Sequence, residues 1–274
     1  MKIFHALITS LVLVILMLTL TGCTPMVVRG GPNQPVSTAI KNPHTTPLGI
    51  KAGRLAVKRN NRESGFLVLS DGEEALLWRG LLADRATQTI DAQYFIWSQD
   101  NVGTIAAERL IQAADRGVRV RVIVDEITLD AKPLFLIYLD GHPNVEIRVY
   151  NPSGSIGMGG VGKIMNLLGD FRRLNRRMHN KAFIVDGSFA ILGGRNVADE
   201  YFDLDPRLNF RDLDLLAVGP VIPEISNSFD EYWNSEWVMP VGDILQIKYL
   251  PEDAEKYFTQ LHEYAGRTEN FPPR

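Results

Sequence analysis

The chain has almost no cysteine, since Cys23 is the only one among 274 residues. A single cysteine excludes an intrachain disulfide framework and a zinc site built from several thiolates. The chain also lacks a large excess of either charge, because 29 Lys and Arg are balanced by 32 Asp and Glu, which gives a formal net charge of −3. The overall charge therefore does not favour nucleic-acid binding. A content of 45% hydrophobic and 22% charged residues is typical of a globular protein.

Long hydrophobic runs are limited to the N-terminus. The run from Ala6 to Leu20 is shorter than the roughly 20 apolar residues of a membrane-spanning helix, but it suits the core of a signal peptide. The sequence Leu-Thr-Gly-Cys that ends at Cys23 resembles a bacterial lipobox. We therefore expect a lipoprotein signal peptide over residues 1–22 and lipidation of Cys23; an ordinary signal peptide or a short anchor is the alternative. Thr24 in place of Asp favours the outer membrane of the bacterial envelope, on its periplasmic face.

The rest of the chain divides into three parts. Residues 23–50 are rich in Pro, Thr and Asn without periodicity, which predicts a flexible tether. Residues 51–240 alternate between helical and strand patterns, which predicts one α/β lobe. Residues 241–274 predict a C-terminal helix and tail, and they resemble the start of a second half that the chain lacks.

The hydrophobic pattern of the lobe predicts a mixed, mostly parallel β-sheet flanked by helices. The expected helices lie at 71–86, 103–116, 134–139 and 224–237. The expected strands lie at 89–97, 118–124, 145–150, 182–185, 189–192 and 213–218. Strand, helix and strand in succession indicate parallel pairing, whereas Asp186-Gly187 between two apolar runs indicates a hairpin.

Polar residues with constrained spacing surround this hairpin, in the pattern H-x-K-x4-D-x6-G-G-x-N. Its members are His179, Lys181, Asp186, Gly193, Gly194 and Asn196. In an extended strand residues two apart share a face, so His179 and Lys181 point the same way, and Asn196 joins them when the hairpin returns. An imidazole, an ammonium and an amide at one point can bind and attack a phosphodiester.

This pattern resembles the signature of the phospholipase D superfamily. Residues 89–97, 117–125 and 229–234 are similar to the flanking elements of bacterial cardiolipin synthases, and residues 177–181, 193–196 and 212–220 are most similar to the C-type subgroup. The resemblance extends over about residues 66–240. It implies a phospholipase D-like lobe with phosphatidyltransferase or phosphodiesterase activity.

The resemblance also implies roles for individual residues, in a mechanism without metal or other cofactor. His179 attacks phosphorus and forms a phosphohistidine, while Lys181 and Asn196 hold the phosphoryl oxygens. Asp186 mostly supports the hairpin. A carboxylate of the later strand orients the histidine, and of Asp212 and Asp214, expected on one face of that strand, Asp212 is favoured.

Four further residues are predicted to bind substrate: Gly193, Gly194, Arg176 and Arg177. Many family members have Ser at the position of Gly194. Arg176 and Arg177 belong to a basic segment with Arg172 and Arg173, which suits anionic phospholipid headgroups; a solvated helix end is the alternative.

The sequence has one H-x-K motif, whereas the superfamily site uses two. Only His179 among the five histidines begins one. We therefore expect a missing second half, a homodimer or an inactive relic. The favoured function is a membrane-associated enzyme acting on phospholipids, with phosphatidylglycerol as the expected lipid, since a lipid anchor concentrates lipid substrate and makes nucleic acid a less favoured partner. The alternatives are a single-motif homodimeric nuclease and a catalytically incomplete lipid-binding lipoprotein. The identities of the donor and acceptor lipids stay open, and so does the choice between transfer of the phosphatidyl group and its hydrolysis.

Overall fold

A computed structural model describes residues 34–57, 62–130, 134–152, 176–245 and 250–270. The predicted signal peptide, the predicted lipidation site Cys23, and Arg172 and Arg173 lie outside the described residues. Within the described part, the longest apolar helices are too short or too polar to cross a bilayer.

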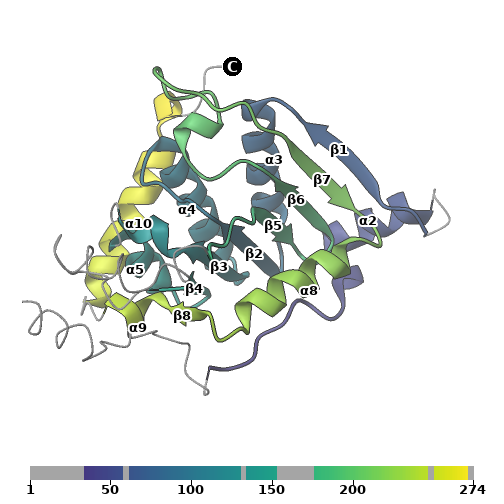
Figure 1. The fold of residues 1–274 in the computed structure, drawn as a ribbon, viewed down its shortest axis with the longest axis horizontal. Helices are drawn as coiled ribbons and strands as arrows, with labels where there is room; N and C mark the ends of the chain where they lie inside the picture. The colour runs from purple at the N-terminus through teal and green to yellow at the C-terminus, as the bar shows by residue number, and fades with distance from the viewer. Residues whose placement is uncertain (1–33, 58–61, 131–133, 153–175, 246–249, 271–274) are drawn as a thin grey trace, which may run out of the picture.

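An eight-stranded mixed sheet forms the centre of the molecule, in the order β1-β7-β6-β5-β2-β3-β4-β8 (Figure 1). The strands are β1 (Gly65–Leu69), β2 (Thr89–Tyr94), β3 (Arg119–Asp125), β4 (Val145–Tyr150), β5 (Ala182–Val185), β6 (Phe189–Gly193), β7 (Asp214–Val218) and β8 (Val238–Pro240). The predicted α/β class with a helix-flanked mixed sheet is confirmed. The expectation of mostly parallel pairing is wrong, because only β2–β3 and β3–β4 are parallel and the other five described pairings are antiparallel. Crossover helices join only β2, β3 and β4, whereas β5 and β6 form a hairpin.

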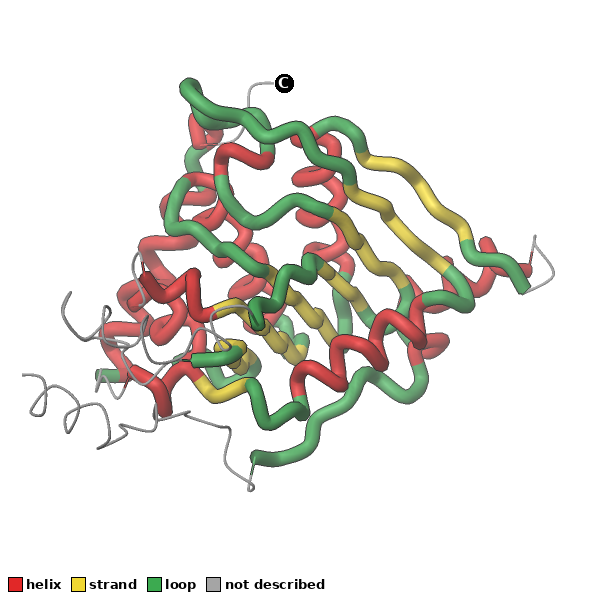
Figure 2. Tube along the Cα trace, in the orientation of Figure 1, coloured by secondary structure: helices red, strands yellow, loops and turns green. Residues whose placement is uncertain are grey.

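Helices cover both faces of the sheet (Figures 1 and 2). They are α2 (Pro47–Val57), α3 (Gly72–Arg85), α4 (Asn101–Asp115), α5 (Leu134–Asp140), α8 (Ile222–Trp233), α9 (Val241–Leu245) and α10 (Pro251–Ala265). Short 3-10 helices lie at Pro43–Thr45, Glu126–Asp130, Asp199–Tyr201 and Thr268–Asn270. Alternate residues of the strands supply two separate cores. Ile90 and Val120 belong to the larger core, with α3 and α4, while Ile123 and Ile184 pack with Phe229 and Trp233 of α8.

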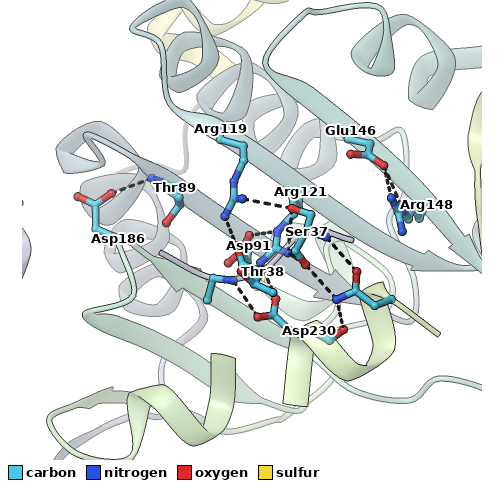
Figure 3. Close-up of polar contacts among 12 residues, drawn as sticks. Ser37, Thr38, Thr89, Asp91, Arg119, Arg121, Glu146, Arg148, Asp186 and Asp230 are labelled. Atoms are coloured by element: carbon cyan, nitrogen blue, oxygen red, sulfur yellow. Dashed lines mark hydrogen bonds and ion pairs between the residues drawn. The ribbon is translucent and has the colours of Figure 1, made fainter. Parts of the chain in front are cut away.

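The packing of α8 on the sheet includes a buried ionic cluster (Figure 3). Arg121 of β3, only 1% exposed, donates to Asp91 of β2 at 2.7 Å and to Asp230 of α8 at 2.8 Å. Its guanidinium also lies over the rings of Phe229 and Trp233, at 4.9 and 5.2 Å from their centroids. Two carboxylates and two aromatic faces thus compensate a charge that would be costly to bury alone.

The segment before α2 is bonded to this cluster (Figure 3). The Ser37 carbonyl accepts from Arg121 at 2.9 Å, the Thr38 carbonyl accepts from Arg119 at 2.8 Å, and the Ala39 N–H donates to Asp230 at 2.8 Å. The flexible tether predicted for residues 23–50 is therefore wrong for its described part, which ends in a helix that begins at Pro47. Backbone carbonyls satisfy guanidinium donors of β3 here, and such bonds leave no hydrophobic periodicity in the sequence.

Replacement of Arg121 tests the ionic cluster. We expect Arg121→Leu to lower the free energy of unfolding by about 3–5 kcal/mol, because it leaves Asp91 buried without a cation. Urea denaturation measures this. The matched control is Arg119→Leu, which removes hydrogen bonds to Ser37 and Thr38 and is expected to cost about 1 kcal/mol. Equal losses in the two variants would contradict the account of the cluster.

Candidate active site

The two ends of the β5–β6 hairpin meet beside the carboxyl end of β2. His179 and Lys181 lie just before β5, and Asn196 lies just after β6. Because β5 and β6 are antiparallel, with Ala182 opposite Leu192, these positions come together at one edge of the sheet. The Gly193 N–H donates to the Lys181 carbonyl at 3.4 Å, a bond that joins the two chain segments at the open end of the hairpin, opposite its turn.

Phe95, next after β2, is the platform for the two basic residues of the motif. The His179 ring lies 4.9 Å from the Phe95 ring, centroid to centroid, with the two planes tilted by 54°. The Lys181 ammonium lies 5.4 Å from the same ring centroid and donates to the His179 carbonyl at 2.8 Å. The imidazole is exposed and the lysine is only 5% exposed. The arrangement places an exposed histidine and a buried lysine against the same aromatic ring.

Burial and charge act on Lys181 in opposite directions. Desolvation lowers the pKa of the ammonium, and the negative charge of Asp212 partly restores it. Asn196 is buried, and its side-chain oxygen accepts from the Ile96 N–H at 3.0 Å. That bond leaves the amide nitrogen of Asn196 as the part of this side chain that can donate to a ligand.

The two candidate carboxylates occupy different environments, so the expectation that they share one face of a strand is wrong. β7 begins only at Asp214, which is fully buried and forms ion pairs with Arg79 at 2.8 Å and with Arg195 at 3.5 Å. Asp212 precedes the strand, is half-buried and lies against Gly194. Of the two, Asp212 is the one whose charge acts on Lys181.

The paired glycines give room to these carboxylates. A Cβ at Gly193 would collide with the carboxylate and backbone of Asp214, and a Cβ at Gly194 would collide with the carboxylate of Asp212. The sequence analysis predicts that both glycines bind substrate. The structure places them against the two carboxylates, a steric reason that a linear pattern does not reveal.

Asp186 lies at the closed end of the hairpin, away from the other motif residues. It adopts a positive φ of 49°, and its carboxylate accepts from the N–H groups of Thr87, Gln88 and Thr89 and from the Thr87 hydroxyl. Four residues of extended chain lie between Lys181 and Asp186, a span of about 16 Å between the two Cα atoms. Asp186 therefore fastens the hairpin to the start of β2 and is not brought to the site.

The sequence analysis missed Asp125, the fully buried last residue of β3. Its carboxylate accepts from Arg177 at 3.0 Å and from the Met178 N–H at 2.9 Å, so it anchors the segment that leads to His179. Burial raises the pKa of Asp125, and the two hydrogen-bond donors oppose that shift. The available signal was a carboxylate directly after a buried parallel strand, where ligand sites of α/β sheets gather.

Of the two arginines predicted to bind substrate, one is engaged by acidic groups. Arg177 also lies 3.3 Å from Glu126, so two carboxylates compensate its charge. Arg176 is exposed, with its guanidinium 5.2 Å from the ring centroid of Trp237. Arg176 is therefore the better placed of the two to meet an anion. Among the described residues, no group of three or more His, Cys, Asp or Glu could hold a metal ion.

Residues 82–233 match the model of a family described as cardiolipin synthase, PLD-like domain. The chain belongs to the PLD-like family. It is 39% identical to cardiolipin synthase C of Escherichia coli over 68% of this chain and 38% of that protein. It is also 38% identical to an uncharacterized protein of Helicobacter pylori, over 81% of this chain and 43% of that one.

A solved structure has a similar fold. The phosphatidylserine synthase of Haemophilus influenzae matches 78% of this chain and 47% of that one, with a TM-score of 0.52 and 11% identity. That likeness concerns the fold alone. The chain spans less than half of the length of these curated relatives.

A methyl group at Gly193 tests the steric account of the glycine pair. We expect Gly193→Ala to lower the free energy of unfolding by about 1–3 kcal/mol, because the added Cβ has no room beside Asp214 and β7. The control is Gly53→Ala in α2, where a Cβ meets nothing within 4 Å. Removal of a helical glycine there is expected to add about 0.5–1 kcal/mol. Thermal unfolding of the two variants measures both changes, and an unchanged Gly193→Ala protein would contradict the account.

Proposed function

We propose that this PLD-like chain acts on the phosphodiester bond of phospholipids, with His179 as the nucleophile. The observation that carries the proposal is the exposed imidazole of His179 held on Phe95 above the buried ammonium of Lys181. The 39% identity with a cardiolipin synthase supports a phospholipid substrate. Phosphatidylglycerol is the lipid that fits this proposal.

The first step forms a bond between a ring nitrogen of His179 and phosphorus. The bond from phosphorus to the headgroup oxygen breaks, and the headgroup alcohol leaves with a proton from a general acid. In the second step the deprotonated form of the same acid takes the proton of an acceptor hydroxyl, the acceptor oxygen attacks phosphorus, the P–N bond breaks and His179 is regenerated. Glycerol has left in the first step, so a second phosphatidylglycerol as acceptor gives cardiolipin, whereas water gives phosphatidic acid.

Three neighbours assist the nucleophile in this scheme. The Lys181 ammonium and the Asn196 amide nitrogen stabilise the negative charge that develops on the phosphoryl oxygens. Asp212 orients the imidazole and helps to keep Lys181 charged, since its negative charge raises the lysine pKa. Arg176 attracts the anionic headgroup. Asp186 acts only through the hairpin that it fastens, as a positioning residue.

The general acid comes from outside the lobe. The described histidines other than His179 lie elsewhere: His142 contacts Asp115 and His262 contacts Glu108, both on α4, and His44 lies in a 3-10 helix near the N-terminus. We therefore infer a second H-x-K motif in trans, from a second half of a longer protein or from a second copy of this chain. The chain matches less than half of the length of these relatives, which favours the second half.

The same proposal places the lobe at a membrane. Lipidation of Cys23 would hold the chain on the periplasmic face of the outer membrane, where lipid substrate is concentrated. The bonds of residues 37 and 38 to β3 and of Ala39 to α8 would then keep the lobe close to its anchor.

Product analysis tests this function. Mature chain from Cys23 onwards, in detergent and EDTA, is incubated with labelled phosphatidylglycerol and separately with labelled DNA, and products are quantified by mass spectrometry. We expect cardiolipin or phosphatidic acid, reduced at least about a thousandfold in His179→Ala because the covalent step is lost. His142→Ala, a histidine replacement away from the site, is expected to keep activity.

Sedimentation of the same sample reports whether an active chain is a dimer. Cleavage of DNA in place of lipid would support the nuclease alternative, and equal product from the parent chain and His179→Ala would contradict the proposed nucleophile. A parent chain without product, which gains activity when the missing half is supplied, would locate the second motif there.

A further inference from the structure

A cavity of about 560 Å³ lies between α3 and α4, on the face of the sheet opposite α8. Its side walls include Leu76, Gly80 and Leu81 of α3 and Ala106 and Leu110 of α4. Its floor includes Tyr94, Trp97 and Val197. The volume is within the range of sites that bury a small molecule, and the lining is mostly apolar.

Small residues keep this space open. Gly80 occupies the interior of α3, where glycine costs roughly 1 kcal/mol relative to alanine. A Cβ at Gly80 would meet nothing within 4 Å, so packing between the helices does not require glycine there. Ala106 faces the same cavity from α4. Leu77 and Leu81, which are 59% and 41% exposed, continue the apolar lining to the surface.

Both arginines of the cavity wall are paired within the protein, whereas the carboxylate of Glu73 lies at the exposed start of α3. Arg79 pairs with Asp214 at 2.8 Å and donates to the Tyr94 hydroxyl at 3.2 Å, and Arg109 pairs with Asp84 at 3.1 Å. An anionic ligand therefore finds both arginines already paired with carboxylates. The lining favours a hydrocarbon, whose burial is favourable without hydrogen bonds.

The cavity shares a wall with the candidate active site. Trp97 and Val197 form a bridge between their two segments and line the cavity. The residues directly before them, Ile96 and Asn196, are joined by the hydrogen bond that fixes the Asn196 amide. Arg79 also links the cavity wall to the motif, because it lines the cavity and its partner Asp214 lies against Gly193.

We propose that this cavity binds an acyl chain of a phospholipid. The identity of the lipid rests on the proposed function. Binding of an acyl chain in the cavity can be tested independently of that function, because binding of a hydrocarbon chain is measured without turnover. The chain would lie against Trp97 and Val197, behind the segments that present Asn196 to the phosphate.

The test is a fluorescence titration of the mature chain with cis-parinaric acid, a fatty acid that becomes fluorescent in an apolar site. We expect saturable binding that is displaced by oleate and by phosphatidylglycerol but not by glycerol phosphate, which has the headgroup without the chain. Absence of saturable binding, or displacement by glycerol phosphate alone, would overturn the proposal.

Two variants test whether cis-parinaric acid binds in this cavity. Gly80→Phe and Ala106→Phe fill the cavity from opposite walls, and each is expected to weaken parinarate binding about tenfold or more, the loss that follows when two methylenes are no longer buried. Gly53→Phe is the matched control, since Gly53 is also a helical glycine with free space at its Cβ and does not line the cavity. Thermal unfolding establishes that each variant is folded. If Gly80→Phe does not fold, the binding measured with Ala106→Phe tests the proposal.

Parinarate binding that is unchanged in a folded cavity variant, or weakened equally in Gly53→Phe, would overturn the acyl-chain site. Loss of lipid turnover in His179→Ala with unchanged parinarate binding would support both proposals. Binding that depends on Gly80 or Ala106, in a chain that cleaves only DNA, would support the cavity and contradict the phospholipid function.

Discussion

The site depends on the buried carboxylate of Asp186, which holds the closed end of the β5–β6 hairpin against the start of β2. It accepts hydrogen bonds from three consecutive backbone N–H groups, those of Thr87, Gln88 and Thr89. These bonds fix the register in which Gln93 lies opposite Ala182. A shift by one residue would turn His179 and Lys181 away from Phe95, because side chains alternate between the faces of a sheet. A residue at the far end of the hairpin thus determines the geometry of the proposed nucleophile.

Burial of charge recurs through the lobe. Asp125, Asp214 and the Arg121 cluster each place ionised groups where water is excluded, and each is balanced by a partner across elements. The same partners join the layers: Arg121 joins β3 to α8, Arg79 joins α3 to β7, and Asp125 joins β3 to the segment before β5. Removal of one partner is therefore expected to cost more than the loss of an equivalent surface pair.

The sequence predicted six of the eight described strands and the hairpin, because apolar runs with turn residues between them report local structure, but it did not predict the edge strands β1 and β8. The spacing of His179, Lys181 and Asn196 also predicted that they would meet at one end of the hairpin. The sequence did not predict contacts between residues that are far apart along the chain. The bonds of residues 37 and 38 to β3, the anchor at Asp125 and the antiparallel pairing of β2 with β5 arise from tertiary contacts that no local pattern records.

The two aspartates near the motif illustrate the same limit. Alternation along a strand predicted that Asp212 and Asp214 would share one face, with Asp212 favoured to orient the histidine, but the strand begins only at Asp214. Asp214 is then committed to Arg79, whereas Asp212 stays beside Gly194 and acts on Lys181. In the proposed mechanism the lobe supplies the nucleophile with its charge-stabilising neighbours, and the proton for the leaving group comes from a second motif.

The central claim is that this half-site carries a competent nucleophile, and a substrate that needs no general acid tests it most directly. Bis(p-nitrophenyl) phosphate has this property, because nitrophenolate leaves without a proton. The measurement is a rapid-quench experiment that records nitrophenolate release and the mass of the His179 peptide. The account predicts a burst of about one equivalent per chain and a phosphoaryl adduct on His179, both absent in His179→Ala and present in His142→Ala. Release without an adduct, or an adduct at another residue, would contradict it.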